Sequence, residues 1–597
     1  MNLTPDQKAV GRDNYYEALG VKRRDFMKEL MVAGAVTGGS LGAMYFNYGK
    51  VGDPLRVGVI GTGDEGQVLI GAVNPDYVQV VAIADIRPYN IHRAFHGDWA
   101  SDAALAARSG LISKYKWNSE DEARKKVKVY DQDYHDLIKD PSVEAVIIAL
   151  PLHLHAKVAL EAMKAGKHVL CEKLMAHNVA QCKVMGRFAN ENSLYLAIGH
   201  QRHYSILYDN AVNMLRWGLL GQIHHIRAQW HRGNLPGNDS WQQPLPGGEK
   251  GSGGKKIDKI TSQFNALKKE LEGERDPARV RLLEKKVAQW LAWTQDAAVN
   301  AQNHGYQDFT LSNGSQRSAL EELVRWRLWE RTGGGLMAEL GSHQLDASTI
   351  FCSALRKDGK KAHPLTVHAV GGRHIFPLDR HAEDHVYCMF EFPGPEYDPE
   401  FPLGYKDPVS GLPDEKNGVP GYEQDPNKKI VVTYSSINGN GYGGYGEVVM
   451  GTRGTLILER EQEVMLYKDS DTSSRVGVKY EKGGPTMDTQ ASGGPAAAVA
   501  KAATDWGGPV SRGYTEEIEH WAYCIRNKAP RETLRCRAEV AMADAIIALT
   551  ANIAINNSIK GEAGYVKFQE EWYDLNNDAT PDGSSCQKEF DSLVKNA

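Results

Sequence analysis

Cysteine is scarce in this sequence, and its seven copies are scattered along the chain. No two of them form a C-x-x-C pair or another spacing typical of metal ligands. The cysteines therefore indicate neither a disulfide framework nor a zinc site, and we expect no metal.

An excess of charge of one sign is also lacking. The chain has 70 basic and 75 acidic side chains, a net charge of −5 and no long basic block. We therefore expect no nucleic-acid partner. The composition, with 42% hydrophobic and 24% charged residues, is that of a soluble globular protein, and 597 residues imply more than one domain.

The N-terminal region contains the segment that comes nearest to a long apolar run. Residues 22–28 read KRRDFMK, and residues 30–49 are uncharged and rich in glycine. Paired arginines before such a segment resemble a twin-arginine export signal. The glycines and Thr37 argue against a stable transmembrane helix.

We therefore predict a leader over residues 1–50 and export to the periplasm. Retention of the leader as a membrane anchor stays open. The alternative is a chance Arg-Arg pair before a short buried helix.

The stretch 55–66, LRVGVIGTGDEG, reads as a buried strand, a glycine turn and the start of a helix. Gly61, Gly63 and Gly66 form G-x-G-x-x-G. The first glycine permits a tight turn, the second lets a pyrophosphate approach the backbone, and the third lets the helix pack close to the strand. The free N–H groups of the helix start favour phosphates.

A second apolar strand, 78–84, ends at Asp85, which lies 24 residues after Gly61. This is close to the spacing at which an acidic residue binds the adenosine ribose. Asp85 favours NAD over NADP, while Arg87 is near enough to weaken that preference by pairing with a 2′-phosphate. We expect the dinucleotide to be bound by Gly61, Thr62, Gly63, Gly66, Asp85 and Arg87. The alternative is a structural βαβ unit with an incidental glycine turn.

Further strands over 143–150 and 167–171, with a helix over 156–165 between them, predict a parallel, doubly wound sheet. Such sheets bind ligands beyond the carboxyl ends of their strands. Pro151, His155, Glu172 and Lys173 fall at those ends, so we add them to the cofactor site. The predicted first domain spans residues 55–176.

Residues 177–560 are predicted to form a second domain, with strands over 221–231, 366–375, 384–393 and 429–437 and two more within 445–459. Residues 232–325 read as an insertion that contains a helical hairpin, which either covers a domain face, contacts another subunit or faces solvent. The Gly/Pro-rich loops 393–427 and 469–513 are long enough to act as lids or contacts. Residues 561–597 are assigned to a tail.

The segment 332–346, TGGGLMAELGSHQLD, carries a second group of ionisable residues. On a helix, Glu339, His343 and Asp346 lie at i, i+4 and i+7, on one face. His343, with an ordinary pKa of roughly 6.5, can take a hydroxyl proton near neutrality. Glu339 or Asp346 could orient it. The alternative is a capped, buried polar helix face.

These motifs, in this order, resemble the Gfo/Idh/MocA family of oxidoreductases. The match rests on G-x-G-x-x-G, Asp85, P-x-x-x-H from Pro151, A-G-K-H-V-L-C-E-K ending at Lys173, and the segment 332–346. It covers roughly residues 55–232 and 326–560. Two positions depart from the family pattern, because Leu174 replaces the proline of Glu-Lys-Pro and Glu339 replaces an aspartate.

The resemblance implies a Rossmann domain that binds NAD and a C-terminal α/β domain with a large, mostly antiparallel open sheet. It also implies that Lys173 lies between nicotinamide and substrate and steadies the reacting oxygen, while His343 removes the hydroxyl proton. We therefore expect an NAD-dependent oxidoreductase that acts on a CH–OH group of a sugar, cyclitol or glycoside. We also expect a tightly held cofactor and a homo-oligomer.

Three alternatives stay open. The first is a redox-neutral glycosidase or lyase that oxidises, eliminates and then reduces. The second is a sugar–sugar oxidoreductase with permanently bound cofactor. The third is a non-catalytic carbohydrate-binding protein.

Overall fold

The structure is a computed structural model, and it describes residues 3–20, 41–251, 254–400, 426–468, 477–481, 484–488 and 512–595. The twin-arginine motif and the segment that follows it up to residue 40 lie outside the described residues. So does most of the two long Gly/Pro-rich loops.

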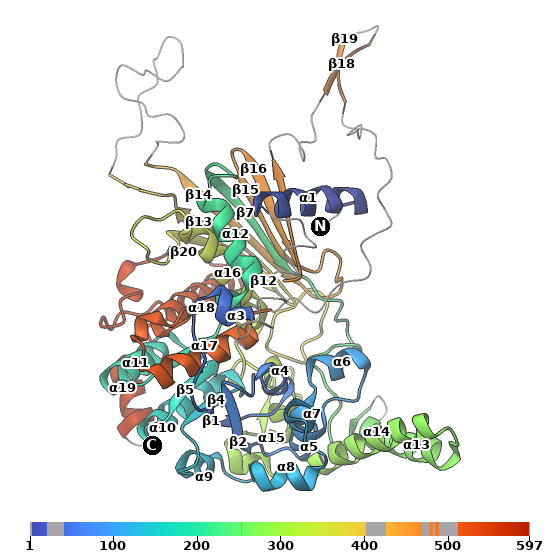
Figure 1. Cartoon of the computed structure of the whole chain (residues 1–597). Coiled ribbons are helices and arrows are strands. Elements are labelled where there is room, and N and C mark those ends of the chain that lie inside the picture. The colour runs from blue at the N-terminus through green and yellow to red at the C-terminus, as the bar shows by residue number, and fades with distance from the viewer. Residues whose placement is uncertain are drawn as a thin grey trace.

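A sheet of six parallel strands forms the first domain, in the order β3-β2-β1-β4-β5-β6 (Figure 1). Its strands are nearly continuous apolar runs because helices cover both faces. They are β1 (Leu55–Ile60), β2 (Val78–Ala84), β3 (Lys128–Tyr130), β4 (Ala145–Ile148), β5 (His168–Glu172) and β6 (Leu196–Gly199). The doubly wound sheet predicted from the sequence is confirmed.

The helices of this domain alternate with its strands. They are α4 (Asp64–Ala72), α5 (Pro88–His96), α6 (Asp102–Ala107), α7 (Gly110–Tyr115), α8 (Glu120–Lys126), α9 (Tyr134–Lys139), α10 (His155–Lys164) and α11 (Val179–Glu191). Because β6 pairs in parallel with β5, the sheet continues to Gly199. The first domain therefore extends to about residue 200, and the predicted boundary at 176 is too early.

An open sheet of eight strands forms the second domain, in the order β17-β16-β15-β7-β14-β13-β12-β20. The pair β14 and β7 is parallel, and the other neighbours are antiparallel. The strands are β7 (Ile223–Trp230), β12 (Thr366–Gly372), β13 (His385–Pro393), β14 (Lys429–Ile437), β15 (Tyr445–Gly451), β16 (Gly454–Glu459), β17 (Glu463–Lys468) and β20 (Tyr565–Lys567). The predicted mostly antiparallel sheet is confirmed.

Helices cover one face of this sheet, and the strands alternate accordingly between buried and exposed side chains. The covering helices include α12 (Ile206–Arg216), α16 (Ser342–Ser353) and α18 (Ala538–Ile559), while α17 (Tyr514–Asn527) packs on the first domain. Helix α18 is long and apolar enough to cross a membrane, but 72% of its apolar window is buried inside the protein. Its packing against β12 and α11 accounts for that composition.

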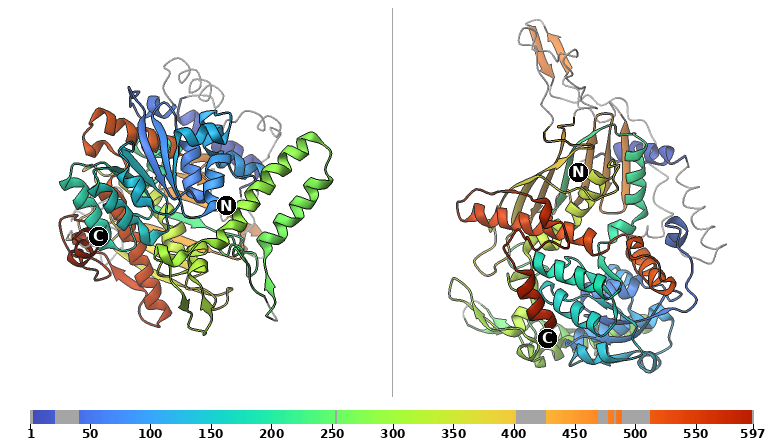
Figure 2. Two further views of the ribbon diagram at one scale, coloured as in Figure 1. Left: turned by 90° about the horizontal axis from the view of Figure 1, so that it is seen from below. Right: turned by 90° about the vertical axis from the view of Figure 1, so that its left-hand side faces the viewer.

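The insertion contains a helical hairpin, α13 (Lys259–Gly273) and α14 (Pro277–Gln295), which stands out from the body in Figure 2. Helix α14 packs against α5 of the first domain, so the hairpin covers part of that domain's surface. The other insertion elements are β8 (Glu249–Lys250), β9 (Lys256–Ile257), β10 (Phe309–Thr310), β11 (Gln316–Arg317) and α15 (Ala319–Val324). Outside the insertion, β18 (Gly477–Glu481) and β19 (Gly484–Asp488) form a separate hairpin.

Both ends of the chain pack against the folded body. Helix α1 (Pro5–Ala18) lies along β17, and α3 (Leu41–Tyr45) contacts α17. At the other end, β20 adds to the second sheet beside β12, and α19 (Cys586–Phe590) packs on α11 of the first domain. The described part of the predicted tail, residues 561–595, therefore contacts both domains, which the prediction of a separate tail missed.

Candidate functional site

The glycine turn after β1 has the shape that a pyrophosphate requires. Gly61 has a φ of +88°, and a Cβ there would lie 2.3 Å from the carbonyl oxygen of Ala149. A Cβ on Gly66 would lie 2.1 Å from the carbonyl oxygen of Gly61. At Gly63, by contrast, the nearest atom to such a Cβ is 3.9 Å away, on Asn90. Close packing thus requires glycine at the first and third positions. The second glycine faces open space at the start of α4, and that space suits the pyrophosphate of a bound dinucleotide.

Asp85 is held against this turn. Its carboxylate accepts hydrogen bonds from the backbone N–H of Thr62 at 2.8 Å and from that of Arg87 at 2.9 Å. The side-chain amide of Asn90 donates to it as well, at 3.1 Å. The spacing had predicted a carboxylate beside the turn, and the structure brings Asp85 and Thr62 together there.

Arg87 points to an unexpected partner. Its Nε donates to the Asp296 carboxylate at 2.8 Å, and Asp296 belongs to the insertion. Arg87 Nη2 is buried without a hydrogen-bond partner among the described residues. The guanidinium that we expected to be available for a 2′-phosphate is therefore already in an ion pair.

His155 connects two loops at the carboxyl edge of the sheet. Its Nδ1 lies 2.8 Å from the carbonyl oxygen of Leu174, and its Nε2 lies 2.8 Å from that of Leu150. The residue is only 2% exposed. Because both ring nitrogens face backbone carbonyls, His155 has a structural role at this edge, and its assignment to the cofactor site stays a prediction. It positions the loop that follows Pro151 against the turn that follows Lys173.

Glu172 and Lys173 end β5 at the same edge. Glu172 is buried, its Oε2 accepts the Lys173 N–H at 3.0 Å, and its Oε1 has no partner among the described residues. Burial and then the neighbouring Glu65 raise the pKa of Glu172 to about 8. Lys173 Nζ reaches across to the second domain and donates to the backbone carbonyl of Glu339 at 2.9 Å.

The segment that contains Glu339 is a π-helical turn, Met337–Gly341, which leads into α16. The Glu339 carboxylate pairs with Arg327 at 2.8 Å. Burial opposes its ionisation, but Arg327 and Lys173 outweigh that effect and lower the pKa of Glu339. Asp346 accepts hydrogen bonds from His203 at 2.9 Å and Lys361 at 2.7 Å.

Neither acid is hydrogen-bonded to His343, so the prediction that one of them orients this histidine is wrong. The reason is partly geometric, since the wider π turn breaks the i, i+4, i+7 alignment that a regular helix would give. It is also chemical, since each carboxylate has a basic partner of its own.

His343 itself makes no side-chain hydrogen bond with any described residue. Its ring lies 5.3 Å from that of Trp230, centroid to centroid. Burial, followed by the nearby cations Lys173 and Arg202, lowers the pKa of His343 well below its ordinary value. At neutral pH the site therefore presents an uncharged imidazole, and no group in the described part of the chain competes for its lone pair.

Two residues of this site were not predicted from the sequence. Trp230, at the end of β7, stacks on Tyr445 with ring centroids 4.4 Å apart. Arg232 lies over the Trp230 ring at 5.7 Å and has no ion-pair partner among the described residues. Only the ordinary alternation of a strand marks these positions in the sequence, so no motif identified them.

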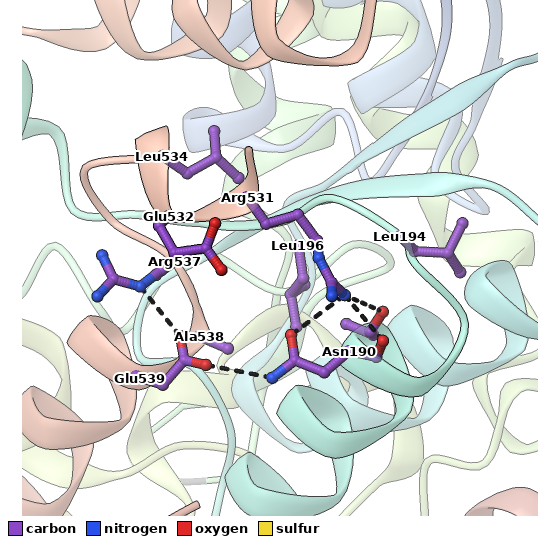
Figure 3. A pocket seen from close by; sticks show the side chains of 10 residues that line it. Asn190, Leu194, Leu196, Arg531, Glu532, Leu534, Arg537, Ala538 and Glu539 are labelled. Carbon is purple, nitrogen blue, oxygen red and sulfur yellow. Dashed lines mark hydrogen bonds and ion pairs between the residues drawn. The ribbon is translucent and has the colours of Figure 1, made fainter. Parts of the chain in front are cut away.

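A separate cavity of about 360 Å³ lies between the end of α11 and the start of α18 (Figure 3). Arg531 there donates to the backbone oxygen of Asn190 at 2.9 Å, and the Asn190 amide donates to Glu539 at 3.2 Å. Its polar groups thus satisfy one another, and no predicted site residue lines it. In the described ranges no group of three or more histidine, cysteine or carboxylate side chains could hold a metal ion.

Comparison with protein families gives a match in the first domain. Residues 55–200 match the Gfo/Idh/MocA family model, described as "Oxidoreductase family, NAD-binding Rossmann fold". Inositol 2-dehydrogenase from Gluconacetobacter diazotrophicus is 31% identical over 186 residues, which are 31% of this chain and 47% of that protein. A 1-carboxy-3-chloro-3,4-dihydroxycyclohexa-1,5-diene dehydrogenase from Comamonas testosteroni is 30% identical over 29% of this chain and 37% of its own length. The chain therefore spans less than half the length of these relatives.

Among solved structures, an aldose-aldose oxidoreductase from Caulobacter crescentus aligns over 86% of this chain and 100% of its own. It has 15% identity and a TM-score of 0.44. A levoglucosan dehydrogenase in complex with NADH and levoglucosan aligns over 87% and 100%, with 16% identity and a TM-score of 0.46. Likenesses this weak carry no conclusion about activity.

The glycine turn, Asp85 beside it and the six-stranded parallel sheet agree with the family match in the same residues. The chain thus contains, in residues 55–200, an NAD-binding Rossmann domain of the Gfo/Idh/MocA oxidoreductase family.

Proposed function

We propose that the protein is an NAD-dependent oxidoreductase that acts on a CH–OH group of a sugar, cyclitol or glycoside. The observation that carries this proposal is that Lys173, at the carboxyl edge of the nucleotide-binding sheet, is close enough to lower the pKa of the His343 imidazole, which has no hydrogen-bond partner among the described residues. Bound NAD would take the hydrogen of the carbinol carbon together with its electron pair. The chain's own residues would then manage the hydroxyl group.

In this proposal His343 accepts the hydroxyl proton. A free, neutral imidazole suits this task because it has a lone pair to offer at neutral pH. Lys173 faces the same space and would stabilise the negative charge that develops on the oxygen. Its hydrogen bond to the Glu339 carbonyl occupies one of its three N–H donors, so two remain for substrate.

A polyol substrate is supported by the aromatic and polar groups beside His343. Trp230 offers an apolar ring, and Arg232, unpaired in the described part of the chain, offers donors to hydroxyl or carboxylate oxygens. This combination suits a sugar ring, which has apolar C–H faces and hydroxyl edges.

Lys173→Ala and His343→Ala should each lower turnover by about two to four orders of magnitude, as expected for lost oxyanion and general-base contacts.

Because the pKa of His343 is lowered, its basic form persists as the pH falls, and the acid limb of the rate profile should lie well below pH ~6.5. Turnover is measured by nicotinamide absorbance with a panel of sugars and cyclitols.

The matched controls are Lys157→Ala on α10 and His224→Ala on β7, both exposed, which should keep wild-type rates. NAD binding should survive in His343→Ala, since that residue comes from the second domain. A near wild-type rate in His343→Ala would remove it from the mechanism.

We further propose that the protein is exported in its folded form with its leader retained. The support is that the segments on both sides of the twin-arginine region contact the body. Tyr15 of α1 is 1% exposed, and the Tyr467 hydroxyl donates to the carbonyl of Gln7 at 2.8 Å. Beyond the motif, the Tyr48 hydroxyl donates to Glu519 at 2.6 Å. Cleavage near residue 40 would detach the segment that contains α1 from the chain.

Changing Arg23 and Arg24 together to lysine should leave the protein in the cytoplasm, while Arg12→Lys, which keeps the charge that pairs with Glu463, should be exported normally. Cell fractionation measures both variants. The mass of the exported wild-type protein should include residues 1–18. Periplasmic recovery of the double variant would refute export by this route, and a shortened mass would refute retention of the leader.

We also propose that NAD is held tightly enough to survive export and purification, because free NAD is scarce outside the cytoplasm. The base of the insertion supports this proposal, since its contacts with α5 cover surface near Asp85. Denatured, dialysed protein should release close to one nicotinamide per chain, measured by mass spectrometry. Less than about a tenth per chain, with micromolar or weaker affinity, would contradict a retained cofactor.

A retained cofactor also keeps the redox-neutral glycosidase or lyase as the second candidate function. Product analysis with an aryl glycoside separates the two activities. Release of the aryl alcohol without net NADH formation would favour the second candidate, whereas a stoichiometric keto-sugar and NADH would favour the first.

Finally, we propose that the protein forms a homo-oligomer through the uncovered face of the eight-stranded sheet. This face exposes the large apolar side chains Val370, Tyr387, Met389 and Tyr565 on three adjacent strands. Exposed apolar patches of this kind mark interaction sites. Light scattering should report a multiple of the 65.9 kDa chain mass, and Tyr387→Asp with Met389→Asp should shift it toward the monomer. A wild-type monomer at micromolar concentration would contradict this proposal.

A further inference from the structure

Asp296 is a fully buried carboxylate whose one charged partner among the described residues is Arg87. It lies just after α14, in a short 3₁₀ turn, and its side chain is 0% exposed. One carboxylate oxygen accepts a hydrogen bond from Arg87 Nε at 2.8 Å, and the other accepts one from the backbone N–H of Tyr89 at 3.0 Å. Both contacts reach the first domain, immediately after Asp85. Asp296 thus ties the insertion to the segment beside the predicted ribose ligand.

Neighbouring contacts make this attachment rigid. Trp293 of α14 stacks on Tyr89 with ring centroids 4.5 Å apart and an interplanar angle of 11°. Ile86, between Asp85 and Arg87, packs against a buried cluster of insertion residues that includes Tyr306 and Leu323. The insertion therefore covers the chain on both sides of Arg87, and the guanidinium has little freedom to leave Asp296.

We propose that Asp296 makes the nucleotide site selective for NAD over NADP by holding Arg87 in a buried ion pair. This assignment rests on the proposed NAD-dependent function and names the residue that sets its cofactor preference. Because Asp296 is about 210 positions from Arg87 in the sequence, the control is supplied by the insertion and not by the nucleotide-binding motif itself.

The charges explain the direction of the preference. Asp85, Arg87 and Asp296 together carry one net negative charge, whereas Asp85 and Arg87 alone would be neutral. A 2′-phosphate adds about two negative charges and would meet two carboxylates and a guanidinium already in a pair. A ribose 2′-hydroxyl is uncharged, so the second carboxylate does not repel it. The pocket thus suits a hydroxyl better than a phosphate.

The test is Asp296→Asn, which removes the charge, keeps the shape and keeps an oxygen that can accept the Tyr89 N–H. Dissociation constants of NAD and NADP are measured by calorimetry on protein from which bound nucleotide has been removed. The ratio of the NADP constant to the NAD constant should fall by about tenfold or more, equivalent to about 1.4 kcal/mol. Glu284→Gln, an exposed change of the same charge on α14, should leave the ratio unchanged.

A double variant gives the internal control. In the double variant, Asp296→Asn with Arg87→Gln, the improvement in NADP affinity should disappear. That improvement depends on the guanidinium that Asp296→Asn releases from its ion pair. If Asp296→Asn does not fold, Arg87→Gln alone remains decisive. Arg87→Gln should change the ratio of the NADP to the NAD dissociation constant by less than about threefold, because in the wild type the ion-paired Arg87 binds a phosphate weakly.

Unchanged selectivity in Asp296→Asn, or strong loss of NADP affinity in Arg87→Gln, would overturn this assignment while leaving NAD binding intact. A wild-type protein that binds neither nucleotide would overturn the proposed function, and this assignment with it.

Discussion

The hydrogen bond from Lys173 Nζ to the backbone carbonyl of Glu339 joins the two domains at the point where the chemistry is proposed. It ties the end of β5 to the π turn that precedes His343. The same ammonium helps to keep Glu339 ionised and His343 neutral, because a cation favours a nearby anion and opposes a second cation. One side chain thus links the two domains and adds to the effects of burial and Arg327 on the charge of the groups around it.

This arrangement assigns different tasks to residues that look alike in the sequence. Asp346 and Glu339 both have basic partners and serve as fixed anions in a site that contains several cations. His343, with no such partner in the described chain, stays available to a ligand. His155 is buried between two carbonyls and serves the geometry of the loops. Pairing, more than residue type, distinguishes the proposed base from the residues around it.

The sequence predicted best what depends on local sterics and periodicity. Gly66 is required by a close backbone contact within its own turn, Gly61 is required by its positive φ as well as by a contact with Ala149 after β4, and the strands of both sheets follow their apolar patterns. It predicted poorly what depends on distant partners. The π turn at Met337–Gly341 looks like a regular helix from its spacing, and the pair of Arg87 with Asp296 joins residues 209 positions apart in the sequence. The end of the first domain was misplaced because β6 is short and separated from β5 by a helix.

The most direct test of this account is the pKa of the His343 imidazole, measured by NMR on protein with ¹⁵N-labelled histidine and assigned by comparison with His343→Asn. In the wild type the pKa should lie well below the ordinary value of roughly 6.5, because the site is buried and Lys173 is close. In Lys173→Met the pKa should rise, since a repelling charge is gone while the burial remains. A wild-type value near 6.5, or a value that Lys173→Met leaves unchanged, would contradict the claim that burial and Lys173 together keep His343 uncharged.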